Sequence, residues 1–232
     1  MTSRGSFWTF AIALAASILM PTGRARAELA LSQLVVELAP ANHARADVEI
    51  WNNDSERVYV ATEPREVLNP GTSSESRKGN PDPEKLGLLV SPAQIILEPG
   101  QRRLLRIAAI APPSDIERVY RVTVKPVVGQ LSAPASGLKV LIGYDVLVIV
   151  RPTTMNPHVT ATRSGNKLTL KNDGNVSVEL SDGKQCDTSE KSCAELPGGR
   201  LYVGARKTIE ARADRPVQYK MKVGARLISA QF

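Results

Sequence analysis

Histidine, cysteine and aromatic residues are scarce in this chain, and each shortage narrows the functions that it can have. The 232 residues include two histidines, two cysteines and 4% aromatic residues. His43 and His158 are isolated, so neither a histidine general base nor a metal centre has the neighbours it needs. Nucleophile-elbow, zinc-protease, phosphate-loop and dinucleotide-binding motifs do not occur. A hydrolase with two carboxylates stays open, although no feature points to one. We therefore expect a binding protein that is no enzyme and needs no cofactor or metal.

Dense basic blocks are also lacking, although the formal net charge is +7. Lysine and arginine are spread along the chain, and few aromatic residues lie between them. Nucleic-acid binding usually shows a concentrated basic patch. We therefore expect no nucleic-acid partner.

A long apolar run occurs only at the N-terminus. Arg4 precedes an apolar stretch over residues 7–20, and Pro21 and the small-x-small sequence 25–27 follow it. The run of about 14 residues is shorter than the about 20 of a membrane span, which makes a membrane anchor the weaker alternative. We predict a signal peptide over residues 1–27, cleaved between Ala27 and Glu28. The mature chain is then exported to the periplasm without an integral membrane segment.

The two cysteines lie close together, with six residues between Cys186 and Cys193. An even number of cysteines in an exported chain favours a disulfide, and this spacing suits a hairpin. We predict a disulfide between Cys186 and Cys193.

Short β-rich runs separated by Gly, Pro, Asn and Asp turns predict an all-β fold. We expect domain 1 over residues 28–152 and a smaller domain 2 over residues 153–232, joined at Arg151-Pro152. The strands expected in domain 1 are 29–38, 46–52, 57–63, 87–90, 94–97, 102–110, 117–127 and 138–151. Those expected in domain 2 are 158–163, 167–171, 177–180, 200–203, 207–211, 217–223 and 225–230. Residues 69–85 are rich in Gly, Pro and Ser, and we expect a mobile loop there.

The longest expected strand, 138–151, has two different faces. Because side chains alternate along a strand, its large residues share one side. They are Leu138, Val140, Ile142, Tyr144 and Val146. This row is either part of an ordinary core or a surface that fills a partner's groove, and alternation alone does not decide between them.

The order of motifs in domain 1 resembles that of the PapD-like periplasmic pilus chaperones. A proline-bearing strand leads to the turn 97–100, Leu-Glu-Pro-Gly, and then to Arg106-Ile107. Glu117 opens an aromatic-containing strand, and the long strand closes with Arg151-Pro152. The resemblance is specific in domain 1 and loose in domain 2, so the chain resembles a divergent member. It implies two Ig-like β-sandwich domains in an L or boomerang arrangement.

The resemblance also implies a function. Such a chaperone donates strand 138–151 to a pilus or surface-fibre subunit whose own sandwich lacks a strand, and delivers the subunit to an outer-membrane usher. The row from Leu138 to Val146 would then bind the exported subunit. A dimer that covers the donor strand of the free protein stays open. The competing hypothesis is a structural or adhesive Ig-like protein that associates with itself.

The chain departs from this family's pattern at the site that anchors the subunit's terminal carboxylate. The family uses a basic residue on the first strand and a lysine four positions before Arg-Pro, whereas residues 31–38 here contain no Arg or Lys and the second position is Leu147. Arg121 and Lys125 are candidate replacements.

The resemblance also implies a charged link between the domains. Glu117 and Arg151 match two of its members and are expected to form an ion pair. The position of a third, acidic member is occupied by Lys222, which has the opposite charge.

Overall fold

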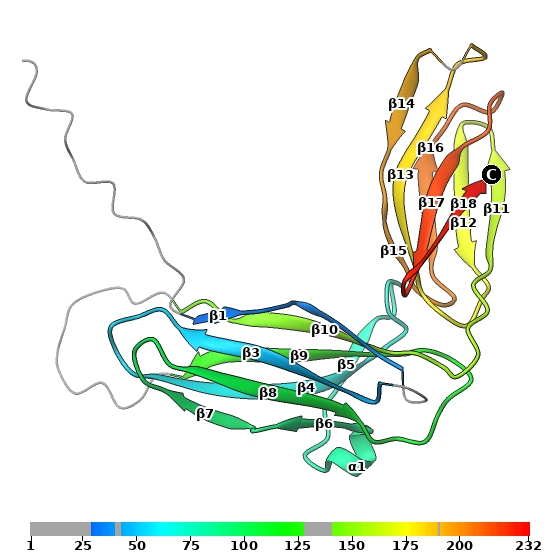
Figure 1. Ribbon diagram of the computed structural model, residues 1–232. Coiled ribbons are helices and arrows are strands. Elements are labelled where there is room, and N and C mark those ends of the chain that lie inside the picture. Colours follow the sequence, from blue (N-terminus) through cyan, green and yellow to red (C-terminus); the bar gives the residue numbers. More distant parts are fainter. Residues whose placement is uncertain (1–28, 40–42, 128–140, 190) are drawn as a thin grey trace, which may run out of the picture.

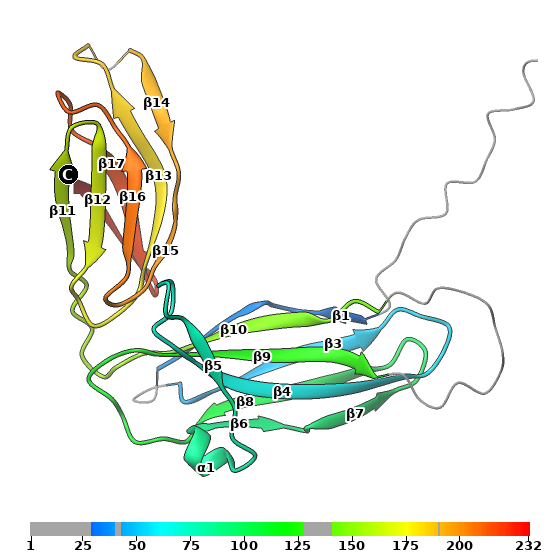
Figure 2. The same cartoon turned by 180° about the vertical axis from the view of Figure 1, so that it is seen from behind.

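The protein consists of two β-sandwiches that meet at one corner in an L (Figures 1 and 2). The computed structural model describes residues 29–39, 43–127, 141–189 and 191–232. The predicted signal peptide and its cleavage site, Ala27–Glu28, lie outside these residues. None of the helices in the described ranges has the length and apolar character needed to cross a membrane.

Two sheets form domain 1. One sheet has the order β1 (Leu29–Leu31), β3 (Arg45–Asn52), β8 (Arg102–Ala109) and β6 (Leu88–Ser91). The other has the order β2 (Val35–Leu38), β10 (Tyr144–Val150), β9 (Arg118–Val127), β4 (Val58–Leu68) and β5 (Ser76–Lys78), with β7 (Gln94–Leu97) also paired to β4.

The core of domain 1 lies between these sheets and follows the alternation of their strands. On β9, for example, Tyr120, Val122 and Val124 are buried, whereas the residues between them face the other way. The expected strand 29–38 is in fact two strands, since β1 joins one sheet and β2 joins the other, parallel to β10.

Domain 2 repeats the sandwich on a smaller scale. One sheet contains β11 (Val159–Ser164), β12 (Lys167–Asn172) and β16 (Arg206–Glu210). The other contains β14 (Cys193–Leu196), β13 (Val178–Cys186), β17 (Gln218–Val223) and β18 (Arg226–Gln231), with β15 (Gly199–Leu201) also paired to β13. The predicted disulfide is confirmed, because Cys186 and Cys193 are bonded and lie opposite each other on β13 and β14.

Segment 69–85 is the clearest departure from the expected elements. It was expected to be a mobile loop, but it contains β5, which pairs with the end of β4, and the short helix α1 (Pro83–Leu86). Asp82 caps this helix by accepting a hydrogen bond from the backbone N–H of Glu84 at 3.0 Å, and Leu86 is buried in the core of domain 1. The prediction is therefore wrong for these residues.

Candidate functional site

The first half of β10 is an open sheet edge. β2 pairs with β10 only from Leu147 to Val150, whereas β9 pairs with it from Tyr144 onward. Along the described residues, Tyr144–Val146 therefore have a neighbouring strand on one side only. An unpaired edge of this kind can accept a strand from another chain.

The large residues of the expected donor strand have different surroundings. Leu138 and Val140 lie outside the described residues. Ile142, which precedes β10, is 56% exposed. The Tyr144 side chain is half-buried, and its hydroxyl donates a hydrogen bond to the Leu29 carbonyl at 2.7 Å. Leu34 and Val35, close to this edge, are about half exposed.

Val146 corrects the prediction that all five large residues are available to a partner. Its side chain is fully buried in the core of domain 1, because the row that faces outward at Ile142 turns inward as the strand enters the sandwich. The described part of the strand, β10, begins only at Tyr144. The exposed apolar surface is thus limited to its N-terminal side.

The opposite face of β10 lies in the corner between the domains. Val67, Val119, Leu147 and Ile149 form a small buried cluster, and Tyr202 of domain 2 packs against it. This burial raises the pKa of Tyr202, whereas the nearby positive charge of Arg121 acts in the opposite direction. Leu147, which occupies one of the expected basic positions, is therefore part of the apolar floor of the corner.

Arg121 and Lys125 both lie on β9, but they have different surroundings. Arg121 is directly opposite Leu147, and its Nη1 donates a hydrogen bond to the Asp145 carbonyl at 3.3 Å. Lys125 lies further from the corner and pairs with Glu63 at 2.7 Å. This pairing lowers the pKa of Glu63. Arg121 is therefore the better placed of the two to contact a ligand in the corner.

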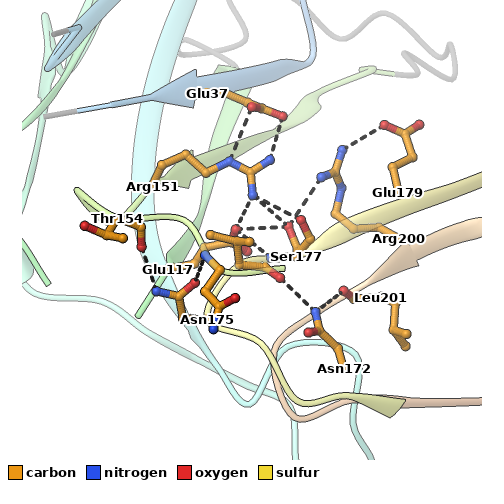
Figure 3. A network of polar contacts seen from close by, with 12 residues as sticks. Glu37, Glu117, Arg151, Thr154, Asn172, Asn175, Ser177, Glu179, Arg200 and Leu201 are labelled. Atoms are coloured by element: carbon orange, nitrogen blue, oxygen red, sulfur yellow. Dashed lines mark hydrogen bonds and ion pairs between the residues drawn. The ribbon is translucent and has the colours of Figure 1, made fainter. Parts of the chain in front are cut away.

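A buried ion pair fastens domain 1 to domain 2 (Figure 3). Arg151 and Glu117 form the expected ion pair, with side chains that are 4% and 1% exposed. The backbone N–H of Ser177, in domain 2, donates a hydrogen bond to Glu117 Oε2 at 2.8 Å. Because both charges are buried, their mutual contact and these hydrogen bonds must replace the water that they lose.

Glu37 is a member of this network that the sequence did not indicate. Its Oε1 lies 3.0 Å from Arg151 Nη2, and it reaches this place because β2 runs parallel to β10. The acidic residue expected at Lys222 is thus replaced from a strand far away in the sequence. Lys222 itself lies opposite Glu179, whose carboxylate binds Arg200 at 3.2 Å.

The connection between the domains is held by side-chain amides as well. Asn175 Nδ2 donates hydrogen bonds to the carbonyls of Asp115 and Thr154, each at 2.8 Å (Figure 3). The Glu117 N–H donates to the Asn175 carbonyl at 3.0 Å. The corner is therefore fixed by both its charged and its neutral groups.

Residues 29–156 match the family model described as "Pili and flagellar-assembly chaperone, PapD N-terminal domain". The chain belongs to this family. A CS1 fimbrial protein of Escherichia coli is 30% identical over 146 residues, which are 60% of this chain and 61% of that protein. A CFA/I fimbrial protein of Escherichia coli is 27% identical over 150 residues, which are 61% and 62% of the two chains. The chain spans about three fifths of the length of these curated relatives.

Solved structures share the complete two-domain fold. The class 5 fimbriae chaperone CfaA has a TM-score of 0.69 at 21% identity, over 88% of this chain and 98% of that one. The SafB chaperone, in complex with the SafA pilin of Salmonella enterica, has a TM-score of 0.61 at 17% identity, over 90% and 98%. At these identities the similarity shows the fold, and the resemblance to PapD-like chaperones inferred from the motifs of domain 1 is confirmed by the family match.

Proposed function

We propose that this member of the PapD family is a periplasmic chaperone that binds pilus or surface-fibre subunits by donating a β-strand to them. The donated segment is residues 138–146, and an outer-membrane usher receives the bound subunit. The observation that carries this proposal is the open edge of β10 next to the exposed Ile142. Residues 1–27 direct export and are removed.

The physical gain of strand donation has two parts. The unpaired N–H and C=O groups of the edge form main-chain hydrogen bonds with the subunit, and alternate side chains fill pockets in it. Each fully buried aliphatic side chain contributes about 1.5–3 kcal/mol. Leu138, Val140 and Ile142 are the side chains that we assign to these pockets, with Tyr144 at the border of the sandwich.

The terminal carboxylate of the subunit needs a basic partner, and we assign this role to Arg121. The proposal favours Arg121 over Lys125 because Arg121 lies beside the corner and Lys125 is already paired with Glu63. An arginine can also bind a carboxylate through two parallel hydrogen bonds.

The second candidate function is a structural or adhesive protein that associates with itself through the same edge. It is favoured by the absence of a basic residue in residues 31–38 and by Leu147 at the second expected anchor position. The two functions differ in stoichiometry. A chaperone forms a one-to-one complex with a different chain, whereas a structural protein forms oligomers of its own chain.

Ile142→Asp tests the proposed function. The tagged mature protein is isolated under mild conditions from its native periplasm, and bound proteins are identified and quantified by mass spectrometry. Leu227→Asp is the matched control, because Leu227 is 60% exposed on β18 of domain 2, away from the β10 edge. We expect the wild type and Leu227→Asp each to retain, in one-to-one stoichiometry, one small exported β-rich subunit.

The expected result for Ile142→Asp is loss of this subunit with an unchanged circular dichroism spectrum. A charge buried in the subunit's groove without a partner is strongly unfavourable. Equal capture by both variants would exclude binding through this edge. Recovery of the wild type as its own oligomer would instead support the self-associating structural protein.

A further inference from the structure

Three arginines gather on the face of domain 1 that looks toward the corner. Arg65 and Arg121 lie directly opposite each other on β4 and β9. Like charges that are directly opposite across two strands destabilise a sheet. Arg77 approaches from β5 and increases the local positive charge. This arrangement favours binding of an anionic group.

One carboxylate of the chain already interacts with this cluster. Asp145 Oδ2 lies 2.9 Å from Arg77 Nη2 and 3.9 Å from Arg121 Nε, and Thr123 Oγ1 donates a hydrogen bond to Asp145 Oδ1 at 3.3 Å. The strand order β10-β9-β4-β5 shows that the Arg77 side chain must cross two strands to reach Asp145. The hairpin that carries Arg77 rises over this face toward domain 2 in both views (Figures 1 and 2).

The contact between Arg77 and Asp145 can be exchanged at little cost. Both side chains are more than a third exposed, and ion pairs in such surroundings contribute about 0–1 kcal/mol. One carboxylate also leaves most of the charge of three guanidinium groups unbalanced. The other carboxylate on this face, Glu63, is engaged by Lys125.

We propose that Asp145 is an internal substitute for the terminal carboxylate of a bound polypeptide, which displaces it from Arg77 and Arg121. Charge complementarity identifies the occupant as a carboxylate. The half-exposed Val35 and the apolar Leu147, which lie opposite each other on β2 and β10, provide a contact for the last side chain of the polypeptide. Only the identity of that polypeptide as a subunit rests on the proposed function. The carboxylate site itself does not.

The test is a titration of the complete mature protein followed by NMR of the arginine Nε–Hε groups. The probe is N-acetyl-leucine, which carries a carboxylate, and N-acetyl-leucinamide is the uncharged comparison. Signals of Arg77 and Arg121 are assigned by their loss in Arg77→Lys and Arg121→Lys. The variant is Asp145→Asn. Its control is Asp47→Asn, because Asp47 forms a similarly exposed ion pair with Arg106, at 2.8 Å, on the other sheet.

In Asp145→Asn, the N-acetyl-leucine concentration that half-saturates the Arg77 and Arg121 shifts is expected to be roughly fivefold lower than in the wild type, as loss of an exposed competing ion pair allows. Asp47→Asn should match the wild type, and the amide should produce no saturable shift. Equal half-saturation in the wild type and Asp145→Asn would overturn the proposal, as would a titration that leaves both arginine signals unchanged. Asp145→Ala, measured in parallel, excludes an effect of the new amide group. Because no subunit is present, failure of this titration is distinct from failure of subunit capture.

Discussion

At the scale of single residues, the buried pair Glu117–Arg151 has the largest expected effect on stability. Removing one partner of a buried ion pair leaves the other charge without compensation and costs about 3–5 kcal/mol. We expect Glu117→Ala to lower the free energy of unfolding, measured in urea, by this amount. The control is Arg57→Ala, because Arg57 and Glu98 form an ion pair with side chains 53% and 52% exposed, and exposed pairs contribute about 0–1 kcal/mol.

The network also limits what an exchange of the two charges can restore. With glutamate and arginine exchanged between positions 117 and 151, Glu37 would face a second carboxylate and the Ser177 N–H would face a cation. The exchange should therefore recover only part of the stability that Glu117→Ala loses. Full recovery would mean that Glu37 and Ser177 are not coupled to the pair.

Tyr120 predicts a loss of stability at high pH. Its side chain is fully buried, its hydroxyl donates a hydrogen bond to the Leu86 carbonyl at 3.2 Å, and burial raises its pKa. A tyrosine in the unfolded chain ionises at about pH 10. The contribution is therefore complete below about pH 10 and is lost as pH rises above it, because the unfolded state then binds fewer protons than the folded state. Urea unfolding at pH 8 and pH 11 measures this loss.

Tyr120→Phe is the test variant for this effect. It removes the ionisable hydroxyl, so the difference in unfolding free energy between the two pH values should become smaller. Tyr219→Phe should act in the same direction, because burial also raises the pKa of Tyr219. An identical pH dependence in the wild type and Tyr120→Phe would contradict the prediction.

At the scale of elements, the hairpin β13–β14 depends on its disulfide. The bond closes a short loop between Cys186 and Cys193 and so restricts the unfolded chain. The variant with both Cys186→Ser and Cys193→Ser should lose on the order of 2 kcal/mol of stability in domain 2, as the loop-entropy model gives for a short loop. Calorimetry of the variant and of the reduced wild type should give the same lowered melting midpoint. An unchanged midpoint would show that the hairpin is held by other contacts.

Most strands could be predicted because their apolar and polar residues alternate. β7 has the predicted bounds, 94–97, and β3 and β8 differ from their predictions by only one residue. β14 was missed because its residues are mostly exposed and show no alternation. β5 was missed for another reason. Its residues are all exposed, and it is a strand only because the end of β4 pairs with it.

The candidate site was predictable where local order decides it. The pair Glu117–Arg151 followed from the motifs that carry the resemblance, and the structure confirms it. Glu37 and Ser177 come from β2 and from domain 2, and no local pattern indicates that they meet. Val146 was assigned to the partner surface because alternation alone does not tell where a strand enters its own sandwich.

At the scale of the whole molecule, the angle between the domains depends on a second contact besides the ion-pair network. Tyr202 of domain 2 covers the cluster formed by Val67, Val119, Leu147 and Ile149. A side chain added at Gly71, in the turn between β4 and β5, would approach the Tyr202 ring to 3.0 Å, so this turn lies directly against domain 2. The corner is thus closed by an apolar contact on one side and by buried charges on the other.

Tyr202→Ala tests whether the apolar contact holds the angle. It removes the aromatic cover of Val67 and Ile149, which costs about 1.5–3 kcal/mol for a side chain of this size. Because the ion-pair network remains, we expect both domains to stay folded while their relative orientation becomes broader. Small-angle X-ray scattering should show a larger radius of gyration, and calorimetry should resolve two transitions. Tyr59→Ala, at an exposed position on β4 of domain 1, is the matched control. If Tyr202→Ala and Tyr59→Ala scatter alike, the ion-pair network alone holds the domains at their angle.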